Sequence, residues 1–142
     1  DSHDTFRQST KRLHEKYHHY SGVIVDIMYD HFLAKNWKRY SDEKLDHFIN
    51  RFYKSLHENY PILTEKTQNL MPTMIRENWL WSYQTIDGIQ HILTQMDRRS
   101  KNQSKMQFAS QELKEFYPEF EHEFDLFFKD VQVQSKQKLL SL

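Results

Sequence analysis

The stretch GVIVDIMYDHFL, residues 22–33, decides the fold, because it is apolar on nearly every side of a helix yet carries three ionisable side chains. A helix with so few polar positions must be buried against its neighbours over most of its surface. The ionisable side chains are those of Asp26, Asp30 and His31. At about 100° per residue, the two aspartates lie one turn apart on one face of this helix, and His31 points elsewhere.

The rest of the chain predicts more helices. Only two glycines and three prolines interrupt 142 residues, and apolar residues recur at spacings of three and four. We therefore expect an all-α fold, a compact multi-helix bundle, with one helical domain over residues 1–130 and a polar, frayed tail over residues 131–142. The first expected helix spans Phe6 to Tyr17, the second starts at Ser21 or Gly22, and the third follows the N-cap Ser41 and ends at Tyr60. The next has Pro72 in its first turn, and another follows the N-cap Thr85. The last two run from Phe108 to Tyr117 and onward from Pro118, the latter with core residues Phe120, Phe124, Phe127 and Phe128.

Composition excludes several classes of protein. Lys plus Arg and Asp plus Glu both number 20, so the formal net charge is zero and a basic surface does not drive binding to nucleic acid. There is no cysteine for a disulfide scaffold or a thiol nucleophile. No apolar run approaches the roughly 20 residues that span a bilayer. We expect a cytoplasmic protein that binds neither nucleic acid nor membrane, and the sequence predicts no oligomeric state.

Two interpretations of Asp26 and Asp30 remain open at this point. A buried carboxylate needs a partner, so arginine or lysine side chains could pair with the aspartates, the aspartates could cap neighbouring helices, or their face could open to water. Alternatively, a divalent cation between them would remove the repulsion of two like charges one turn apart. Oxygen and imidazole ligands suit Mn²⁺, Mg²⁺ or Fe²⁺. In that case His31 would act outside the first ligand shell, or it would only satisfy a hydrogen bond in the core.

Several segments resemble one known family. They are DSH (1–3), FRQSTKRLHEKY (6–17), HYSGVIVDIMYDHFLAKNW (19–37), LMP (70–72), WL (79–80) with Tyr83, GI (88–89) and the M-x-R pattern of Met96 to Arg98. Together they are similar to the acyl carrier protein phosphodiesterase family, hydrolases that remove phosphopantetheine from holo acyl carrier protein. The resemblance implies an all-α fold distantly similar to HD-type metal phosphohydrolases, with Mn²⁺ as cofactor. It also implies a further N-terminal segment ending in an HR..D..TD.H motif, of which only residues 1–3 would be present.

The resemblance also implies roles for particular residues. Asp26 and Asp30 would be metal ligands, and His31 or His3 would orient a water or protonate the serine oxygen of the carrier protein. Arg98 could hold a phosphate oxygen, although a cation at a helix C-terminus also stabilises the helix dipole. The partner would be acyl carrier protein, an acidic protein.

A basic surface for that acidic partner is expected within the first forty residues, which contain Arg7, Lys11, Arg12, Lys16, Lys35, Lys38 and Arg39. Arg7 and Lys11 are four residues apart, which places them on one helix face. Two rival functions remain. One is a non-catalytic interaction domain with exposed Trp37, Trp79 and Trp81, and the other is an HD-type phosphohydrolase acting on a nucleotide or another small phosphodiester.

Overall fold

The computed structural model describes residues 2–140, with side chains through Lys138, and every regular element within that range is helical. This confirms the expected all-α fold. Across residues 2–140, no helix is both long enough and apolar enough to cross a membrane. The α-helices are α1 (Ser2–Tyr17), α2 (Ser21–Lys35), α3 (Leu45–Glu58), α4 (Glu65–Arg76), α5 (Trp79–Ser82), α6 (Ile86–Arg99), α7 (Ser110–Glu115) and α8 (Tyr117–Leu140), and the short 3₁₀ turns are η1 (His18–Tyr20), η2 (Trp37–Arg39), η3 (Tyr60–Ile62) and η4 (Met106–Phe108).

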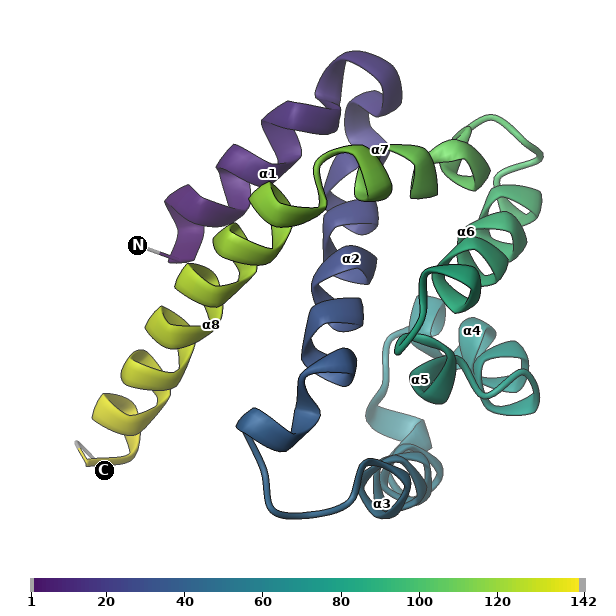
Figure 1. The fold of residues 1–142 in the computed structure, drawn as a ribbon. Helices are drawn as coiled ribbons and strands as arrows, with labels where there is room; N and C mark the ends of the chain where they lie inside the picture. Colours follow the sequence, from purple (N-terminus) through teal and green to yellow (C-terminus); the bar gives the residue numbers. More distant parts are fainter. Residues whose placement is uncertain (1, 141–142) are drawn as a thin grey trace.

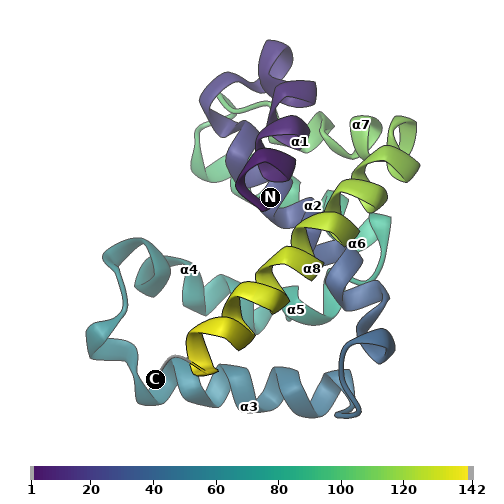
Figure 2. The same cartoon turned by 90° about the vertical axis from the view of Figure 1, so that its left-hand side faces the viewer.

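Helix α2 lies in the middle of the bundle (Figure 1). Helices α1 and α8 run antiparallel beside each other on one side of α2, and α6 lies on the other side. Helices α3, α4 and α5 lie around the lower end of α2 and α6, and Figure 2 shows α3 lengthwise along that end. The central position of α2 is the reason why its sequence is apolar on most sides.

The core is built around α2. Ile24, Val25 and Phe32 are fully buried, and Phe120 and Phe124 of α8 pack into the same cluster. Burial of side chains of this size stabilises the fold by about 1.5–3 kcal/mol each relative to full exposure. The apolar residues of 22–33 are therefore mostly buried, as their composition predicts.

A buried ionic contact holds α1 against α8. Both guanidinium nitrogens of Arg12 donate to the carboxylate of Glu123, at 2.6 and 2.9 Å, and the Ser9 hydroxyl donates to the same carboxylate at 2.7 Å. The Tyr29 hydroxyl of α2 lies 2.6 Å from the Ser9 hydroxyl, so the network reaches the central helix. Because the Glu123 carboxylate is only 4% exposed, these contacts replace the water that it has lost.

Two predicted helix starts are wrong. Ser41 does not cap α3: its hydroxyl accepts a hydrogen bond from the backbone N–H of Glu43, two residues on, and the helix begins only at Leu45. A serine hydroxyl bonded in this way forms a local turn and is no longer available as a cap. By contrast, Thr85 caps α6 as expected, accepting from the Gly88 N–H at 3.0 Å.

Pro72 does not begin a helix but lies inside α4. The helix starts at Glu65, because the Thr64 side chain caps it by accepting from the Thr67 N–H at 3.2 Å. A proline inside a helix loses one backbone hydrogen bond. Helix α4 nevertheless continues to Arg76, and the neighbouring Met71 is buried in the fold.

The C-terminal part of the chain continues as helix where we expected a frayed tail. Helix α8 runs to Leu140, so this part of the chain is helical. Its residues are mostly polar, as expected, and residues 132–138 are exposed. Residues 141 and 142 of the expected tail lie outside the described residues. Phe127 and Phe128 are only partly buried, and Phe108 is 49% exposed, so these expected core positions are less buried than Phe120 and Phe124.

The two glycines should respond oppositely to alanine. A Cβ at Gly88 would lie 1.9 Å from the backbone oxygen of Ser82, whereas a Cβ at Gly22 meets nothing within 4 Å. We expect Gly88→Ala to lower the free energy of unfolding by about 1–3 kcal/mol or more, because α5 and α6 must separate. Gly22→Ala, the matched control within α2, should raise it by up to about 1 kcal/mol. Urea unfolding measures both, and equal stability of the two variants would contradict the close contact between α5 and α6.

Candidate functional site

One stripe of α2 is not covered by the core. Val23, Asp26, Asp30 and Leu33 follow one another at spacings of three and four residues, so they share a face. The two aspartates are exposed, and Val23 and Leu33 are half-buried. The stripe lies where α8, α3 and α4 leave α2 uncovered. Its two polar side chains are those of Asp26 and Asp30.

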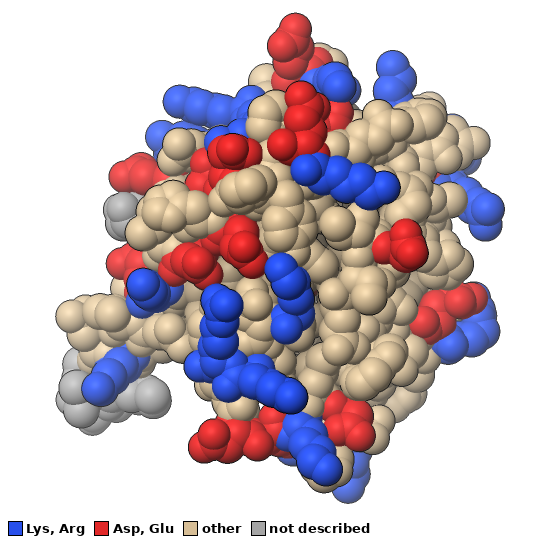
Figure 3. Space-filling view, in the orientation of Figure 1, with Lys and Arg blue, Asp and Glu red and all other residues tan. Residues whose placement is uncertain are grey.

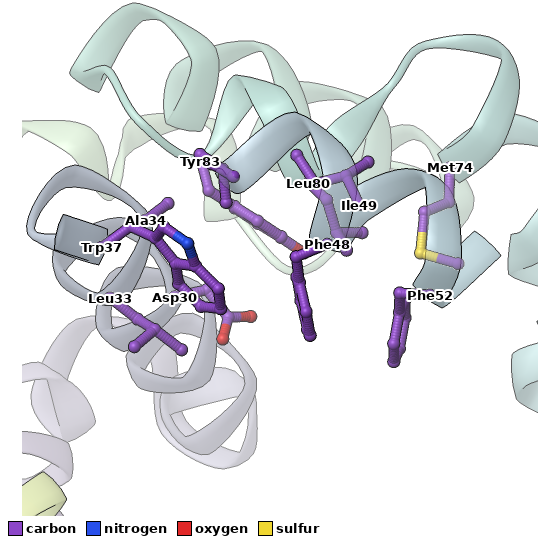
Figure 4. A pocket seen from close by; sticks show the side chains of 11 residues that line it. Asp30, Leu33, Ala34, Trp37, Phe48, Ile49, Phe52, Met74, Leu80 and Tyr83 are labelled. Carbon is purple, nitrogen blue, oxygen red and sulfur yellow. The ribbon is translucent and has the colours of Figure 1, made fainter. Parts of the chain in front are cut away.

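Two cavities meet at Asp30. A cavity of about 400 Å³ lies between α2 and α8, and both aspartates line it together with Phe124, Phe127 and Phe128. The other cavity, of about 340 Å³, is almost wholly apolar. Figure 4 shows Asp30 at its edge, with the carboxylate turned toward the space between Leu33 and Phe48. The residues around this second cavity come from α2, η2, α3, α4 and the α5 region: Asp30, Leu33, Ala34, Trp37, Leu45, Phe48, Ile49, Phe52, Met74, Leu80 and Tyr83.

Neither aspartate is paired. Among residues 2–138, no side chain makes a hydrogen bond or an ion pair with Asp26 or Asp30. Asp30 is reached by solvent yet lies in a concave, mostly apolar setting, and this desolvation, together with the charge of Asp26, raises its pKa to about 7. Burial also raises the pKa of Asp26, and the positive charge of Lys66 partly opposes that rise. The interpretation that arginine or lysine neutralises the pair by direct contact is therefore not supported.

The pair fits a divalent cation in part. Two unpaired carboxylates one turn apart offer hard oxygen ligands, and ions such as Mg²⁺ are often held by one or two carboxylates, with water and substrate phosphate as the other ligands. Within the described residues, no three His, Asp or Glu side chains lie close enough together to form a metal site by themselves. The described chain thus offers two protein ligands and no complete ligand cage.

His31 does not face the aspartates. Its Nδ1 lies 2.7 Å from the backbone oxygen of Tyr83, and since a carbonyl only accepts, Nδ1 carries the proton. Its Nε2, 2.9 Å from the Tyr117 hydroxyl, then accepts, and Lys35 donates to that hydroxyl at 2.9 Å. Burial lowers the pKa of His31. With both ring nitrogens used, the geometry does not support the expected acid–base role, and His31 instead links α2 to the α5–α6 turn and to α8.

The other predicted site residues lie away from the pair. His3 and Arg7 contact each other on α1, 2.7 Å apart, and Lys11 is exposed on the same helix. Arg98 is exposed at the end of α6. None of these four residues lines either cavity that contains Asp26 or Asp30.

Sequence reasoning gave no site role to two neighbours of the pair, although Tyr83 is among the residues that carry the family resemblance. Lys66 of α4 is close enough for its charge to act on Asp26, and Tyr83 lines the apolar cavity with Asp30, whose charge, after burial, helps to raise the pKa of Tyr83. No local signal marks Lys66, because α4 is far from α2 in sequence. Tyr83 has the apolar spacing of an inward-facing residue, and this pattern does not distinguish a core position from a cavity wall.

A basic cluster lies at the end of α2. Figure 3 shows Lys and Arg side chains gathered over η2, with acidic side chains beside them. Lys38 and Arg39 of η2 line a polar cavity of about 670 Å³ together with Lys35 and Lys44, and this cavity shares Trp37 with the apolar one. We call Lys38, Arg39 and Lys44 the η2 basic cluster. Lys38 and Arg39 belong to the basic surface expected within the first forty residues, and they adjoin a cavity that Asp30 lines, whereas Arg7 and Lys11 do not.

The tryptophans do not form an exposed surface. Trp79 is 3% exposed, and its N–H donates to Gln95 at 2.7 Å. Trp37 is half-buried, and its N–H donates to the backbone oxygen of Glu43. Trp81 is 48% exposed. A non-catalytic interaction domain built on three exposed tryptophans is therefore not supported.

The raised pKa of Asp30 makes a prediction about stability in the presence of a chelator. An aspartate in the unfolded chain has a pKa of about 4, whereas Asp30 in the folded protein has a pKa of about 7. The folded state therefore binds the Asp30 proton more tightly than the unfolded state does. The resulting contribution to the free energy of unfolding is lost as pH rises from about 4 through about 7. The Asp30→Asn variant has no titratable group at this position, so its stability does not decrease in this way. We expect its melting temperature, relative to that of the wild type, to increase between pH 5 and pH 8, while the exposed control Asp87→Asn shows a constant difference. A difference for Asp30→Asn that did not change with pH would contradict the raised pKa.

Comparison with known proteins adds an independent finding. A sequence model described as acyl carrier protein phosphodiesterase matches residues 1–131. The chain is 29% identical over 136 residues to an acyl carrier protein phosphodiesterase of Enterobacter sp., covering 95% of this chain and 67% of the relative. It is 27% identical over 139 residues to the protein of the same name from Photorhabdus laumondii, covering 97% of this chain and 70% of that relative. No solved structure matches the chain.

Proposed function

Because the chain belongs to the acyl carrier protein phosphodiesterase family, as the match over residues 1–131 shows, we propose that it hydrolyses the phosphodiester bond between 4′-phosphopantetheine and a serine of holo acyl carrier protein. The products would be apo acyl carrier protein and 4′-phosphopantetheine. The observation that carries the proposal is the unpaired carboxylate pair, Asp26 and Asp30, on the open stripe of α2 where two cavities meet.

Asp26 and Asp30 are the residues that would hold a divalent cation, most simply Mn²⁺, with Mg²⁺ or Fe²⁺ as alternatives. Such an ion, when bound, supplies an activated water and neutralises charge on the phosphoryl oxygens. The carboxylates are free for this role, because they face solvent and the two cavities and no Lys or Arg side chain of the described residues contacts them. An ion between them would also remove the repulsion that raises the pKa of Asp30.

Tyr83 replaces His31 as the proposed proton donor. Burial raises the pKa of Tyr83, so its hydroxyl stays protonated at neutral pH. Within the described chain no hydrogen bond from this hydroxyl is found, and the side chain lines the cavity that Asp30 borders. The hydroxyl is thus available to donate to the departing serine oxygen. Both nitrogens of His31 are already bonded.

The η2 basic cluster supports an acidic protein as the substrate. Lys38, Arg39 and Lys44 have no ion-pair partner among the described side chains, and they adjoin the apolar cavity next to Asp30. Their charges would attract an acidic carrier protein and orient it so that its prosthetic group reaches the pair. The chain has no net charge, so such attraction has to be local.

The test is conversion of holo acyl carrier protein to apo protein, followed by intact-mass analysis with Mn²⁺ and with a chelator. We expect loss of the phosphopantetheine mass in the presence of Mn²⁺ and none with the chelator. A nucleotide phosphodiester offered under the same conditions distinguishes the rival HD-type activity. Turnover of the nucleotide without turnover of the carrier protein would overturn the proposal.

A further inference from the structure

A third cavity lies along the same stripe of α2, at its other end. It has a volume of about 290 Å³, and Val23, one turn before Asp26, forms part of its wall. Lys66 of α4 and Arg99 of α6 line it as well. The open stripe of α2 therefore runs from a cavity with two cationic side chains, past the carboxylate pair, to the apolar cavity beside Asp30.

Arg99 is held in place beside Lys66. Its guanidinium donates to the backbone oxygen of Asn69 at 3.0 Å, and Asn69 is three residues after Lys66, on the same face of α4. This contact uses one N–H group of Arg99. Since a guanidinium has five N–H donors, others remain for a ligand.

The two cations have no acidic partner in contact. No carboxylate among residues 2–138 forms an ion pair with Lys66 or Arg99, and the charge of Lys66 acts on Asp26 only from a distance. Both side chains are exposed, so an anion can reach them from solvent. The rest of the wall is apolar, with Val23, Leu70, Met96 and Met106, and it carries the hydroxyl-bearing residues Tyr20 and Ser100.

These features suit a phosphate ester of an organic molecule. Its phosphate would pair with the cations, and its carbon skeleton would contact the apolar wall. We propose a subsite in which Lys66 and Arg99 bind oxygens of the scissile phosphate of the 4′-phosphopantetheine group from the side of this cavity, while the phosphorus lies between them and the aspartate pair and the pantetheine chain extends along the apolar wall. The inference rests on the proposed function. It explains how an anionic substrate can approach two carboxylates that would otherwise repel it.

Binding measurements with two ligands test the subsite without relying on turnover. 4′-Phosphopantetheine and pantetheine differ only in the phosphate, and their titration can be followed by NMR of the metal-free protein. We expect the wild type to bind 4′-phosphopantetheine at least about tenfold more tightly, because a charge-assisted hydrogen bond contributes about this factor. Lys66→Gln and Arg99→Gln should each remove most of that preference and leave pantetheine binding unchanged. Lys54→Gln, an exposed lysine of α3 that lines none of these cavities, is the matched control.

The kinetic counterpart separates this inference from the proposed function. Lys66→Gln should raise KM for holo acyl carrier protein about tenfold or more, whereas Lys54→Gln should not. If the wild type converts holo to apo protein and Lys66→Gln keeps its KM and its ligand preference, the subsite is wrong and the activity stands. If the wild type does not convert holo to apo protein, but binds 4′-phosphopantetheine and Lys66→Gln removes this binding, the proposed function fails and the subsite stands.

Discussion

The Asp30→Asn variant is expected to convert holo to apo acyl carrier protein at least about 100-fold more slowly than the wild type, and Asp26→Asn should behave alike. This follows from the metal-ligand role that we propose for the pair: replacing even an outer partner of a metal ligand commonly costs about 10–100-fold in affinity or activity, so the loss of a proposed ligand should cost at least as much. Asparagine keeps the shape of the side chain but lacks the charge that a divalent cation requires.

Stability separates a functional from a structural role for the pair. Because the Asp30 carboxylate has a raised pKa and no contact partner, its charge does not stabilise the fold at neutral pH. The Asn variant should therefore melt at or above the wild-type temperature while losing activity. Asp87→Asn, an exposed aspartate in the first turn of α6, serves as the control and should keep full activity. Unchanged turnover in both Asp26→Asn and Asp30→Asn would exclude the pair from the reaction.

Glu123→Ala should produce the largest loss of stability. The substitution leaves the Arg12 guanidinium without its two charged contacts and removes the acceptor for the Ser9 hydroxyl. Breaking a buried pair from one side costs about 3–5 kcal/mol. This is a large share of the total stability of an ordinary domain, about 5–15 kcal/mol. We expect urea unfolding to show this loss as an earlier midpoint.

A glutamate two residues away on α8 provides the matched control. Glu121 is paired with Lys35 at 3.5 Å, and both side chains are substantially exposed. Glu121→Ala should therefore cost no more than about 1 kcal/mol. If Glu123→Ala were as mild as Glu121→Ala, the Arg12 contact would not be what holds α1 to α8. Other contacts of α1 would then be the candidates, such as the bond from the Ser2 N–H to Asp130 of α8 at 2.5 Å, or those from Lys16 and Tyr17 to Glu112 of α7 at 2.7 and 2.8 Å.

The local sequence pattern predicted most of the fold, because an amphipathic helix is recognised from apolar residues three and four positions apart. The apolar residues of 22–33 and the cap at Thr85 act within one or two turns, so they could be recognised without any knowledge of the neighbours. The errors at Ser41 and Pro72 have the same origin. Each has an intrinsic preference for a helix start, but Ser41 bonds within its own turn, and Thr64 caps α4 earlier in the chain.

The candidate site could be predicted only in part. Helical geometry alone places Asp26 and Asp30 on one face and His31 on another. The sequence could not indicate that His31 would use both ring nitrogens on Tyr83 and Tyr117, since those partners are 52 and 86 residues away. Nor could it choose among the 20 Lys and Arg residues the ones that would lie near the pair.

By itself the sequence determined that a mostly apolar helix would lie at the centre of an all-α bundle, with two carboxylates on one of its faces. Only the tertiary structure decided what that face meets: cavities instead of arginine or lysine contacts, Lys66 and Arg99 at one end, and an apolar wall at the other. The physical reason is that the orientation of a side chain on its helix is a local property. Its partners, its solvent and its pKa depend on groups that folding brings from distant parts of the chain.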